Sequence, residues 1–239
     1  MRLRLLFPFI LFSLSGFAQQ NNHADAVKKE DFRDDWAALR HYQKENLELP
    51  SPAKNEKRVV FLGSSIFEYW KNHMPEFFNN NAYIDRGISG QISPQLLIRF
   101  RQDVIDLKPK AVVILAGSND IAGSTGHVTN EVIMNNIRSM SELAKLHGIK
   151  VILCAYLPVF EYPWRKELEQ PAEKIKSLNR EIEQYAKDNK FTLLDYFTPL
   201  VDERGGQRKE LTLDGVHPNL EGYKIMAIAT EKAIEKTLK

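Results

Sequence analysis

The chain has 239 residues, of which 43% are apolar and 27% are charged, and its formal net charge is +2. This length and composition suit one domain with a full hydrophobic core. The charges nearly balance, so the sequence offers no basic surface that could bind a polyanion. It therefore argues against nucleic-acid binding.

The first 18 residues have the layout of a secretory signal peptide. Two arginines open the chain, an apolar run extends over residues 5–14, and Gly16-Phe17-Ala18 offers a small-x-small cleavage site. This run is short for a membrane span. We predict cleavage after Ala18, export to the periplasm or the extracellular space, and no stable membrane insertion afterwards. A retained membrane anchor is the alternative, and the absence of a cysteine near the cleavage site argues against a lipid anchor.

The domain is expected over residues 30–239, with its core over 58–237, after a flexible polar segment at 19–29. Residues 30–47 carry apolar side chains at helical spacing, which predicts a helix ahead of the first strand. These side chains are Phe32, Trp36, Leu39 and Tyr42.

Beyond this segment, apolar runs of strand length alternate with helical segments. The runs are 59–62, 82–85, 111–116, 150–157 and 191–195, and helices are expected from Ser93-Pro94, around Ile133–Ala144, from Pro171 and from about Asn219. Strands that are apolar on both faces and alternate with helices indicate a parallel sheet covered on both sides. The predicted fold class is therefore α/β, a three-layer α/β/α sandwich with a five-stranded parallel sheet. Cys154, the single cysteine, lies in the fourth run and is predicted to be a core residue.

Residues able to do chemistry follow four of the five predicted strands. They are Gly63-Ser64-Ser65 after the first, Gly87 and Gly90 after the second, Asn119 and Asp120 after the third, and Asp214 and His217 after the fifth. Ligands of such sheets bind beyond the carboxyl ends of the strands, so these residues should converge on one edge. A hydroxyl, a glycine turn, a carboxamide and an Asp–His pair are together the parts needed for acyl transfer.

Each part has a physical role in that reaction. A serine hydroxyl is a poor nucleophile and needs a base within hydrogen-bond reach, a role that suits His217. Asp214 can fix the tautomer of the imidazole, and a glycine N–H and the side chain of Asn119 can bind the oxyanion. Taken singly, each motif is commonly only a turn or a helix cap. Their joint placement after successive strands favours a catalytic site.

The constellation resembles the SGNH (GDSL) hydrolase family over residues 58–235, with all four blocks in the right order. The resemblance implies a flavodoxin-like SGNH hydrolase fold with Ser65 as the nucleophile and His217 and Asp214 as its triad partners. It also implies an oxyanion hole formed by the N–H groups of Ser65 and Gly90 and the side chain of Asn119. The first block of the family reads Gly-Asp-Ser, and Ser64 replaces that aspartate here.

We therefore predict an exported serine esterase that hydrolyses carboxylic esters through an acyl-enzyme, without a metal or organic cofactor. Its partner is a small-molecule or carbohydrate ester. Short acyl groups are favoured, acetyl esters of carbohydrates among them, because no long apolar segment is present to sequester an acyl chain. The loop after the fourth strand offers possible substrate contacts at Phe160, Tyr162, Trp164 and Arg165, and a purely structural loop is the alternative.

Two other functions stay open at this point. One is a lysophospholipase or thioesterase that acts on longer acyl chains. The other is a non-catalytic carbohydrate-binding protein on the same fold, against which the complete set of catalytic residue types argues. The oligomeric state does not follow from the sequence.

Overall fold

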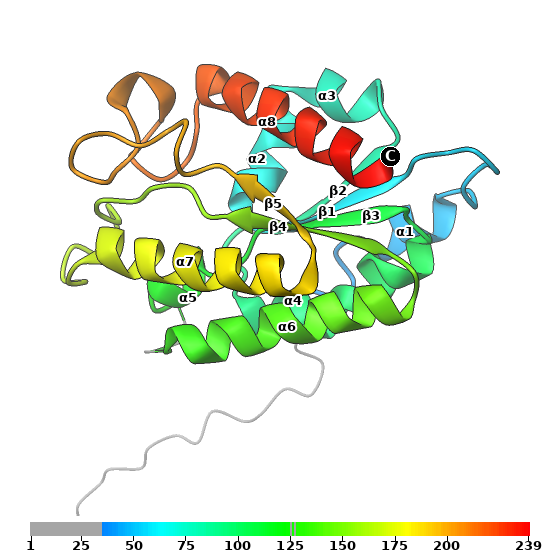
Figure 1. Ribbon diagram of the computed structural model, residues 1–239, viewed down its shortest axis with the longest axis horizontal. Coiled ribbons are helices and arrows are strands. Elements are labelled where there is room, and N and C mark those ends of the chain that lie inside the picture. The colour runs from blue at the N-terminus through cyan, green and yellow to red at the C-terminus, as the bar shows by residue number, and fades with distance from the viewer. Residues whose placement is uncertain (1–34, 125, 127) are drawn as a thin grey trace, which may run out of the picture. The chain divides into compact units, whose positions relative to one another are not determined.

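Five parallel strands form one sheet in the order β2-β1-β3-β4-β5 (Figure 1). The computed structural model describes residues 35–124, 126 and 128–239. The strands are β1 (Val59–Gly63), β2 (Tyr83–Gly87), β3 (Ala111–Ile114), β4 (Lys150–Ala155) and β5 (Thr192–Asp195). All five predicted runs form strands, and their ends differ from the prediction by at most two residues.

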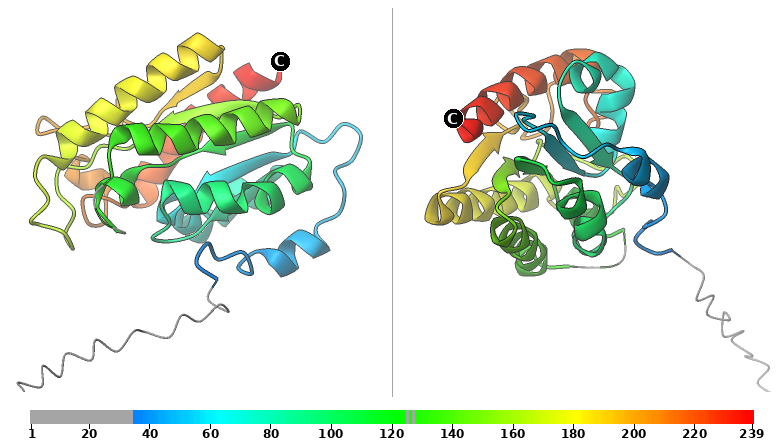
Figure 2. Two further views of the ribbon diagram at one scale, coloured as in Figure 1. Left: turned by 90° about the horizontal axis from the view of Figure 1, so that it is seen from below. Right: turned by 90° about the vertical axis from the view of Figure 1, so that its right-hand side faces the viewer.

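Helices cover both faces of this sheet (Figure 2). One face carries α2 (Ser65–His73), α3 (Pro75–Asn79) and α8 (Leu220–Leu238), and the other carries α4 (Ser93–Asp103), α6 (Asn130–Leu146) and α7 (Pro171–Asn189). Two further short helices are α1 (Gln43–Glu48) and α5 (Ser118–Ile121), and single 3₁₀ turns lie at Ile105–Leu107 and Lys209–Leu211. The predicted three-layer sandwich is confirmed.

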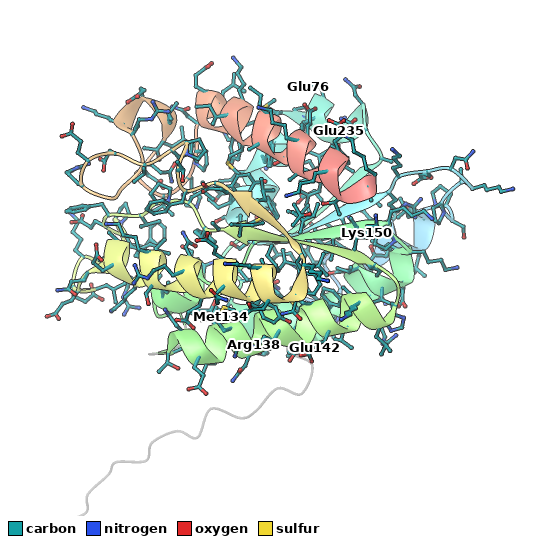
Figure 3. All side chains as sticks on the ribbon, viewed as in Figure 1. Glu76, Met134, Arg138, Glu142, Lys150 and Glu235 are labelled. Carbon is teal, nitrogen blue, oxygen red and sulfur yellow. The ribbon has the colours of Figure 1, made fainter. Side chains whose placement is uncertain are left out.

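Local sequence signals explain where the long helices begin and end. The side chain of Asn219 accepts a hydrogen bond from the N–H of Gly222 at 3.1 Å and so caps the start of α8. Gly148 follows α6 with φ of +70°, a left-handed conformation that ends the helix. Along α6, Met134 is buried and Glu142 is exposed (Figure 3), as expected for an amphipathic helix on a sheet.

The predicted helix over residues 30–47 is confirmed at residues 43–47 and wrong at residues 36–42. Residues 36–42 form turns, and helix α1 begins only at Gln43. Ala38 has φ of +55°, which breaks a right-handed helix, and the carboxylate of Asp35 accepts from the N–H of Leu39 at 2.8 Å and so stabilises a turn. The apolar spacing here reflects single anchors such as the buried Tyr42, whereas Trp36 is 53% exposed.

Residues 35–239 form one compact unit, and the single cysteine is buried in its core as predicted. Burial raises the pKa of the Cys154 thiol well above its usual value. The predicted signal peptide, the segment 19–29 and residues 30–34 lie outside the described residues. Within the described ranges, no helix has both the length and the apolar character needed to cross a membrane.

Candidate active site

The strand order brings three of the predicted loops to one edge of the sheet. From β1 the chain crosses outward to β2 and then returns past β1 to β3, so the direction of winding reverses between β1 and β3. In open α/β sheets this reversal leaves a crevice at the carboxyl ends of the strands. Ser65 begins α2 after β1, Gly90 lies in the loop after β2, and Asn119 lies on α5 after β3.

The three predicted triad residues form a continuous hydrogen-bonded series. The Oγ of Ser65 lies 3.0 Å from Nε2 of His217, across 152 residues of sequence. Nδ1 of His217 lies 2.7 Å from Oδ2 of Asp214. With the carboxylate accepting from Nδ1–H, Nε2 is the acceptor that faces the serine hydroxyl.

The Asp214 carboxylate is held by its own turn. Its Oδ1 accepts hydrogen bonds from the N–H groups of Val216 at 2.9 Å and His217 at 2.8 Å. Burial alone would raise the pKa of Asp214, but the hydrogen bonds from the backbone and ring of His217 and from Val216 outweigh it and hold the pKa below its ordinary value. The carboxylate is therefore ionised at neutral pH and can orient the imidazole.

Aromatic rings flank the imidazole of His217. The ring centroid of Tyr69 lies 5.1 Å away, and that of Trp164 lies 5.9 Å away at an interplanar angle of 30°. The side chain of His217 is 13% exposed. The imidazole is thus confined on its faces, with its two nitrogens committed to Ser65 and Asp214.

Ser65 and His217 open into a cavity of about 210 Å³. Its lining also includes Gly90 and Asn119, the other two predicted oxyanion residues, so the structure brings these four predicted residues together. The full lining is Ser65, Tyr69, Ser89, Gly90, Ser118, Asn119, Ser124, Tyr156, Trp164, Val216 and His217. Asp214 lies behind the imidazole.

The loop that carries Gly90 is tied to the start of α2. The carboxylate of Glu68 accepts hydrogen bonds from the N–H of Ser89 at 2.8 Å and from its hydroxyl. A Cβ on Gly87 would lie 2.5 Å from the backbone nitrogen of Glu68, so only glycine lets the end of β2 approach the helix this closely. Gly90 itself has φ of +76°, a conformation that also favours glycine.

Ser64 has a different role from the helix cap that its position suggests. Its side chain makes no capping hydrogen bond to α2, and its carbonyl accepts from the N–H of Phe67 at 3.1 Å. Burial raises the pKa of the Tyr156 hydroxyl to about 12, opposed by hydrogen bonds with Ser118 and Ser64. The 5% exposed Ser64 therefore lies beside the hydroxyls of Ser118 and Tyr156, two residues that line the cavity.

The predicted substrate loop is corrected in part. Trp164, 50% exposed, lines the cavity, but Tyr162 is fully buried with its hydroxyl 2.8 Å from Oγ of Ser118. Arg165 pairs with Glu167 at 2.6 Å and donates to the Gly123 carbonyl at 3.0 Å. Tyr162 is therefore a structural residue of the loop, and Arg165, whose side chain is 37% exposed, does not line the cavity.

Phe160, the fourth predicted contact, does not line the catalytic cavity. Its ring lies 5.0 Å below the guanidinium of Arg204 and borders a separate cavity of about 220 Å³ beside Asp214. An aromatic residue in a loop can point inward or outward, and residue type alone does not decide which.

Sequence reasoning missed two of the cavity's aromatic residues. Tyr69 lies four residues after Ser65 on α2, so the helical i, i+4 relation placed it on the same face. Tyr156 directly follows β4 at its carboxyl end. The rule that functional residues follow the carboxyl ends of parallel strands points to Tyr156 as well.

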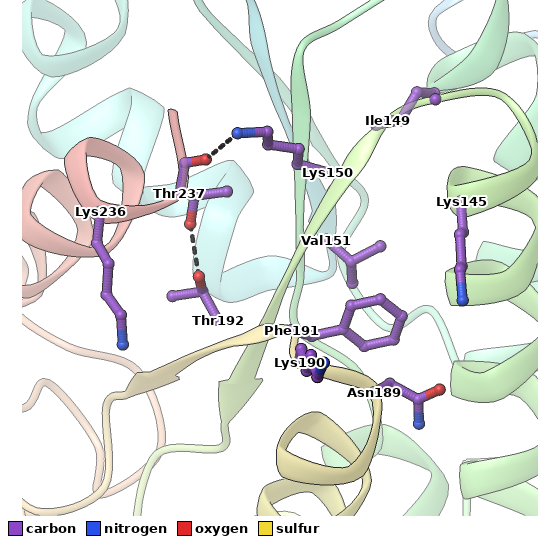
Figure 4. Close-up of a pocket in the computed structure, with 11 residues that line it drawn as sticks. Lys145, Ile149, Lys150, Val151, Asn189, Lys190, Phe191, Thr192, Lys236 and Thr237 are labelled. Atoms are coloured by element: carbon purple, nitrogen blue, oxygen red, sulfur yellow. Dashed lines mark hydrogen bonds between the residues drawn. The ribbon is translucent and has the colours of Figure 1, made fainter. Parts of the chain in front are cut away.

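A larger cavity, of about 530 Å³, lies at the opposite edge of the sheet, beside the first residues of β4 and β5 (Figure 4). Lysines from the last turns of α6 and α8 and from the C-cap of α7 line it: Lys145, Lys236 and Lys190. The Nζ of Lys150 donates to the carbonyl of Thr237 at 2.6 Å. The lysine side chains complement the negative carboxyl ends of three helices, and this structural role explains why lysines gather here.

Comparison with known proteins agrees with this geometry. The model of the GDSL-like lipase/acylhydrolase family matches residues 61–225. An inferred acylhydrolase from Bacteroides fragilis is 48% identical, with a TM-score of 0.85 over 86% of this chain and 100% of that one. A GDSL-like lipase from Bacteroides thetaiotaomicron is 50% identical, with a TM-score of 0.82 over 84% of this chain and 98% of that one.

A curated relative matches over a shorter stretch. The uncharacterized lipoprotein YqeF of Bacillus subtilis is 34% identical over 98 residues, which are 39% of this chain and 40% of that protein. The family match, by contrast, covers more than half of the chain, including the serine, the glycine and asparagine loops and the Asp–His turn. The chain therefore belongs to the GDSL-like lipase/acylhydrolase family.

Proposed function

We propose that the protein is a serine esterase that hydrolyses carboxylic esters through an acyl-enzyme. Family membership supports hydrolytic activity on esters. The observation that carries the proposal is the hydrogen-bonded series from Ser65 through His217 to Asp214 at the wall of a cavity. A nucleophile, a base and a group that orients the base are the arrangement that acyl transfer requires.

In the first half of the reaction, Ser65 Oγ attacks the carbonyl carbon of the ester while its proton passes to Nε2 of His217. The tetrahedral intermediate then collapses. The bond between the carbonyl carbon and the alcohol oxygen breaks, and the alcohol leaves with the proton from His217. Asp214 stabilises the imidazolium during this step.

In the second half, water attacks the acyl group on Ser65 and gives a proton to His217. Collapse of the second intermediate releases the acid and returns the proton to Ser65 Oγ. Both intermediates carry an oxyanion. The proposed donors are the N–H of Ser65 in the first turn of α2, the N–H of Gly90 and the amide of Asn119, all on the lining of the same cavity.

The size and lining of the cavity favour a short acyl group. Its volume is about 210 Å³, and Tyr69, Tyr156 and Trp164 contribute to its wall. The half-exposed ring of Trp164 offers a flat surface of the kind that packs on a sugar face. We therefore propose short-chain esters, acetyl esters of carbohydrates among them, as the substrate class.

We propose that the enzyme acts after export. The sequence pattern of residues 1–18 supports this, and so does the similarity to a protein named as a lipoprotein in Bacillus subtilis. Comparing the mass of the purified mature protein with that of the full chain tests the predicted cleavage after Ala18.

The test of the function combines a labelling experiment with a series of p-nitrophenyl esters. A fluorophosphonate should label the wild type and Ser64→Ala but not Ser65→Ala. The kcat/KM should be highest for the acetyl and propionyl esters and fall for octanoyl and longer chains. Labelling that survives in Ser65→Ala contradicts the nucleophile assignment, and a maximum at long chains indicates a lysophospholipase or thioesterase instead.

A further inference from the structure

Arg99 on α4 is a fully buried arginine whose guanidinium uses every nitrogen as a donor. Nη1 pairs with the equally buried carboxylate of Asp103 at 2.9 Å, and Nε donates to Oε1 of Gln91 at 2.6 Å. Nη2 donates to two backbone carbonyls, that of Gly63 at 3.0 Å and that of Arg86 at 2.7 Å. A buried cation is costly unless it is fully paired in this way.

These partners lie next to the loops of the active site. Gly63 is the last residue of β1, two positions before Ser65. Arg86 is the penultimate residue of β2, and it leads into the loop that carries Gly90. Arg99 thus holds together the ends of the two neighbouring strands from which the serine and the glycine loop emerge.

Gln91 extends this connection to the third loop. It directly follows Gly90, it is 5% exposed, and its N–H donates to the carbonyl of Ile88 at 3.3 Å, closing the turn around Gly90. Its own carbonyl accepts from Nδ2 of Asn119 at 2.9 Å. One amide hydrogen of Asn119 is therefore held by Gln91, and this cavity-lining side chain keeps a second amide hydrogen that can serve as a donor.

We propose that Arg99 is a positioning residue that aligns the three oxyanion donors, Ser65, Gly90 and Asn119, by holding the strand ends and Gln91 in one fixed geometry. This inference rests on the proposed esterase function. A planar guanidinium presents its donors in a rigid fork, which can bind two carbonyls, an amide and a carboxylate at once. A lysine ammonium keeps the charge but not the fork.

The test compares Arg99→Lys with a matched control, Arg58→Lys. Arg58 is also buried, at 4% exposure, and its guanidinium donates to the carbonyls of Leu107 and Pro50 and to the carboxylate of Glu56. It precedes β1 at the opposite end of the sheet from Ser65. The two substitutions disturb similar buried networks, but only one of the networks reaches the active site.

Both variants should lose thermal stability. For p-nitrophenyl acetate, Arg99→Lys should lower kcat by about 10- to 100-fold with KM within about twofold, because misaligned donors act on the transition state. Arg58→Lys should keep kcat within about twofold of the wild type. A purely structural role for Arg99 predicts equal kcat values for the two variants at temperatures equally far below their melting points.

A double-mutant cycle provides the second readout. If Arg99 acts through the oxyanion donors, Arg99→Lys should cost much less in the Asn119→Ala background than in the wild type, because part of what it aligns is already gone. Equal costs in both backgrounds overturn the proposal. If Arg99→Lys does not fold, Gln91→Ala takes its place. It removes the hydrogen bond from Nε of Arg99 to Gln91, while the Arg99–Asp103 pair and the backbone carbonyl that accepts from Asn119 stay.

Different results refute the proposed esterase function and the proposed positioning role of Arg99. A wild type that hydrolyses esters, together with an Arg99→Lys variant that matches the control, refutes the positioning role alone. A wild type that neither hydrolyses esters nor takes up the fluorophosphonate label overturns both.

Discussion

Replacing Asp214 by asparagine separates the electrostatic role of the carboxylate from its structural role. Oδ1 of Asp214 accepts from the N–H groups of Val216 and His217, and an asparagine Oδ1 can accept both of these bonds unchanged. The new amide then directs its NH₂ group at Nδ1 of His217, now 2.7 Å from Oδ2. An NH₂ group is a donor, so it favours the tautomer with the proton on Nε2.

That tautomer presents an N–H to Ser65, which then lacks a base for its proton. The corresponding change in Ser–His–Asp enzymes costs about 10⁴-fold in kcat. At about 1.4 kcal/mol per factor of ten, we expect the activation free energy to rise by about 5 kcal/mol. Because the side chain of Asp214 is 37% exposed, and water can compensate in part, a loss of about 10³-fold is the lower end of the expected range.

The assay is hydrolysis of p-nitrophenyl acetate, with circular dichroism and thermal melting as controls for the fold. KM should change little, since Asp214 lies behind the imidazole and not on the cavity lining. A folded Asp214→Asn variant that keeps more than about a tenth of the wild-type kcat would refute the tautomer argument.

Three further predictions follow from the same geometry. Asn119→Ala should lower kcat by about 10²- to 10³-fold with a small effect on KM, and a loss that lies wholly in KM would make Asn119 a substrate contact. The kcat/KM should be higher at neutral than at acid pH, because the mechanism needs a neutral base to accept the Ser65 proton. A flat profile between about pH 5 and 9, or activity lost to a chelator, contradicts this mechanism. Burial raises the pKa of Asp85 from 3.8 to about 7, against the hydrogen bond from the Gly87 N–H. The folded state therefore holds this proton to higher pH than the unfolded state, stability should fall as the pH rises between these two values, and Asp85→Asn should flatten the fall. Urea unfolding at several pH values checks this, and equal pH slopes for both proteins contradict it.

The sheet could be predicted from the sequence because its three central strands, β1, β3 and β4, are buried on both faces. At β1, β3 and β4, uninterrupted apolar runs of four to seven residues between amphipathic helices leave few alternatives to a covered parallel sheet. The Asp–His pair could be predicted for a related reason, since its geometry is local. Asp214 and His217 lie three residues apart, and a single turn brings carboxylate and imidazole together.

Apolar periodicity is a poor guide where a segment has no sheet or helix to pack its apolar face against. At residues 36–42, spacing that suited a helix comes from isolated anchors in turns, and Ala38 has a left-handed conformation that propensity does not reveal. The aromatic residues after β4 looked alike in sequence, yet Tyr162 is buried against Ser118 and Trp164 lies over His217. The direction of a loop side chain depends on what the neighbouring loops leave open.

By itself, then, the sequence determined the order of buried strands and covering helices along the chain, and the residues that follow those strands. Burial and turn formation depend on local patterns of residue type, which a sequence shows directly. Only the tertiary structure decided that Ser65 and His217 lie 3.0 Å apart across 152 residues, and that the buried Arg99 ties the ends of β1 and β2 to Gln91. The physical reason is that such contacts depend on strand order and register. These emerge from packing the whole core at once, so no local segment encodes them.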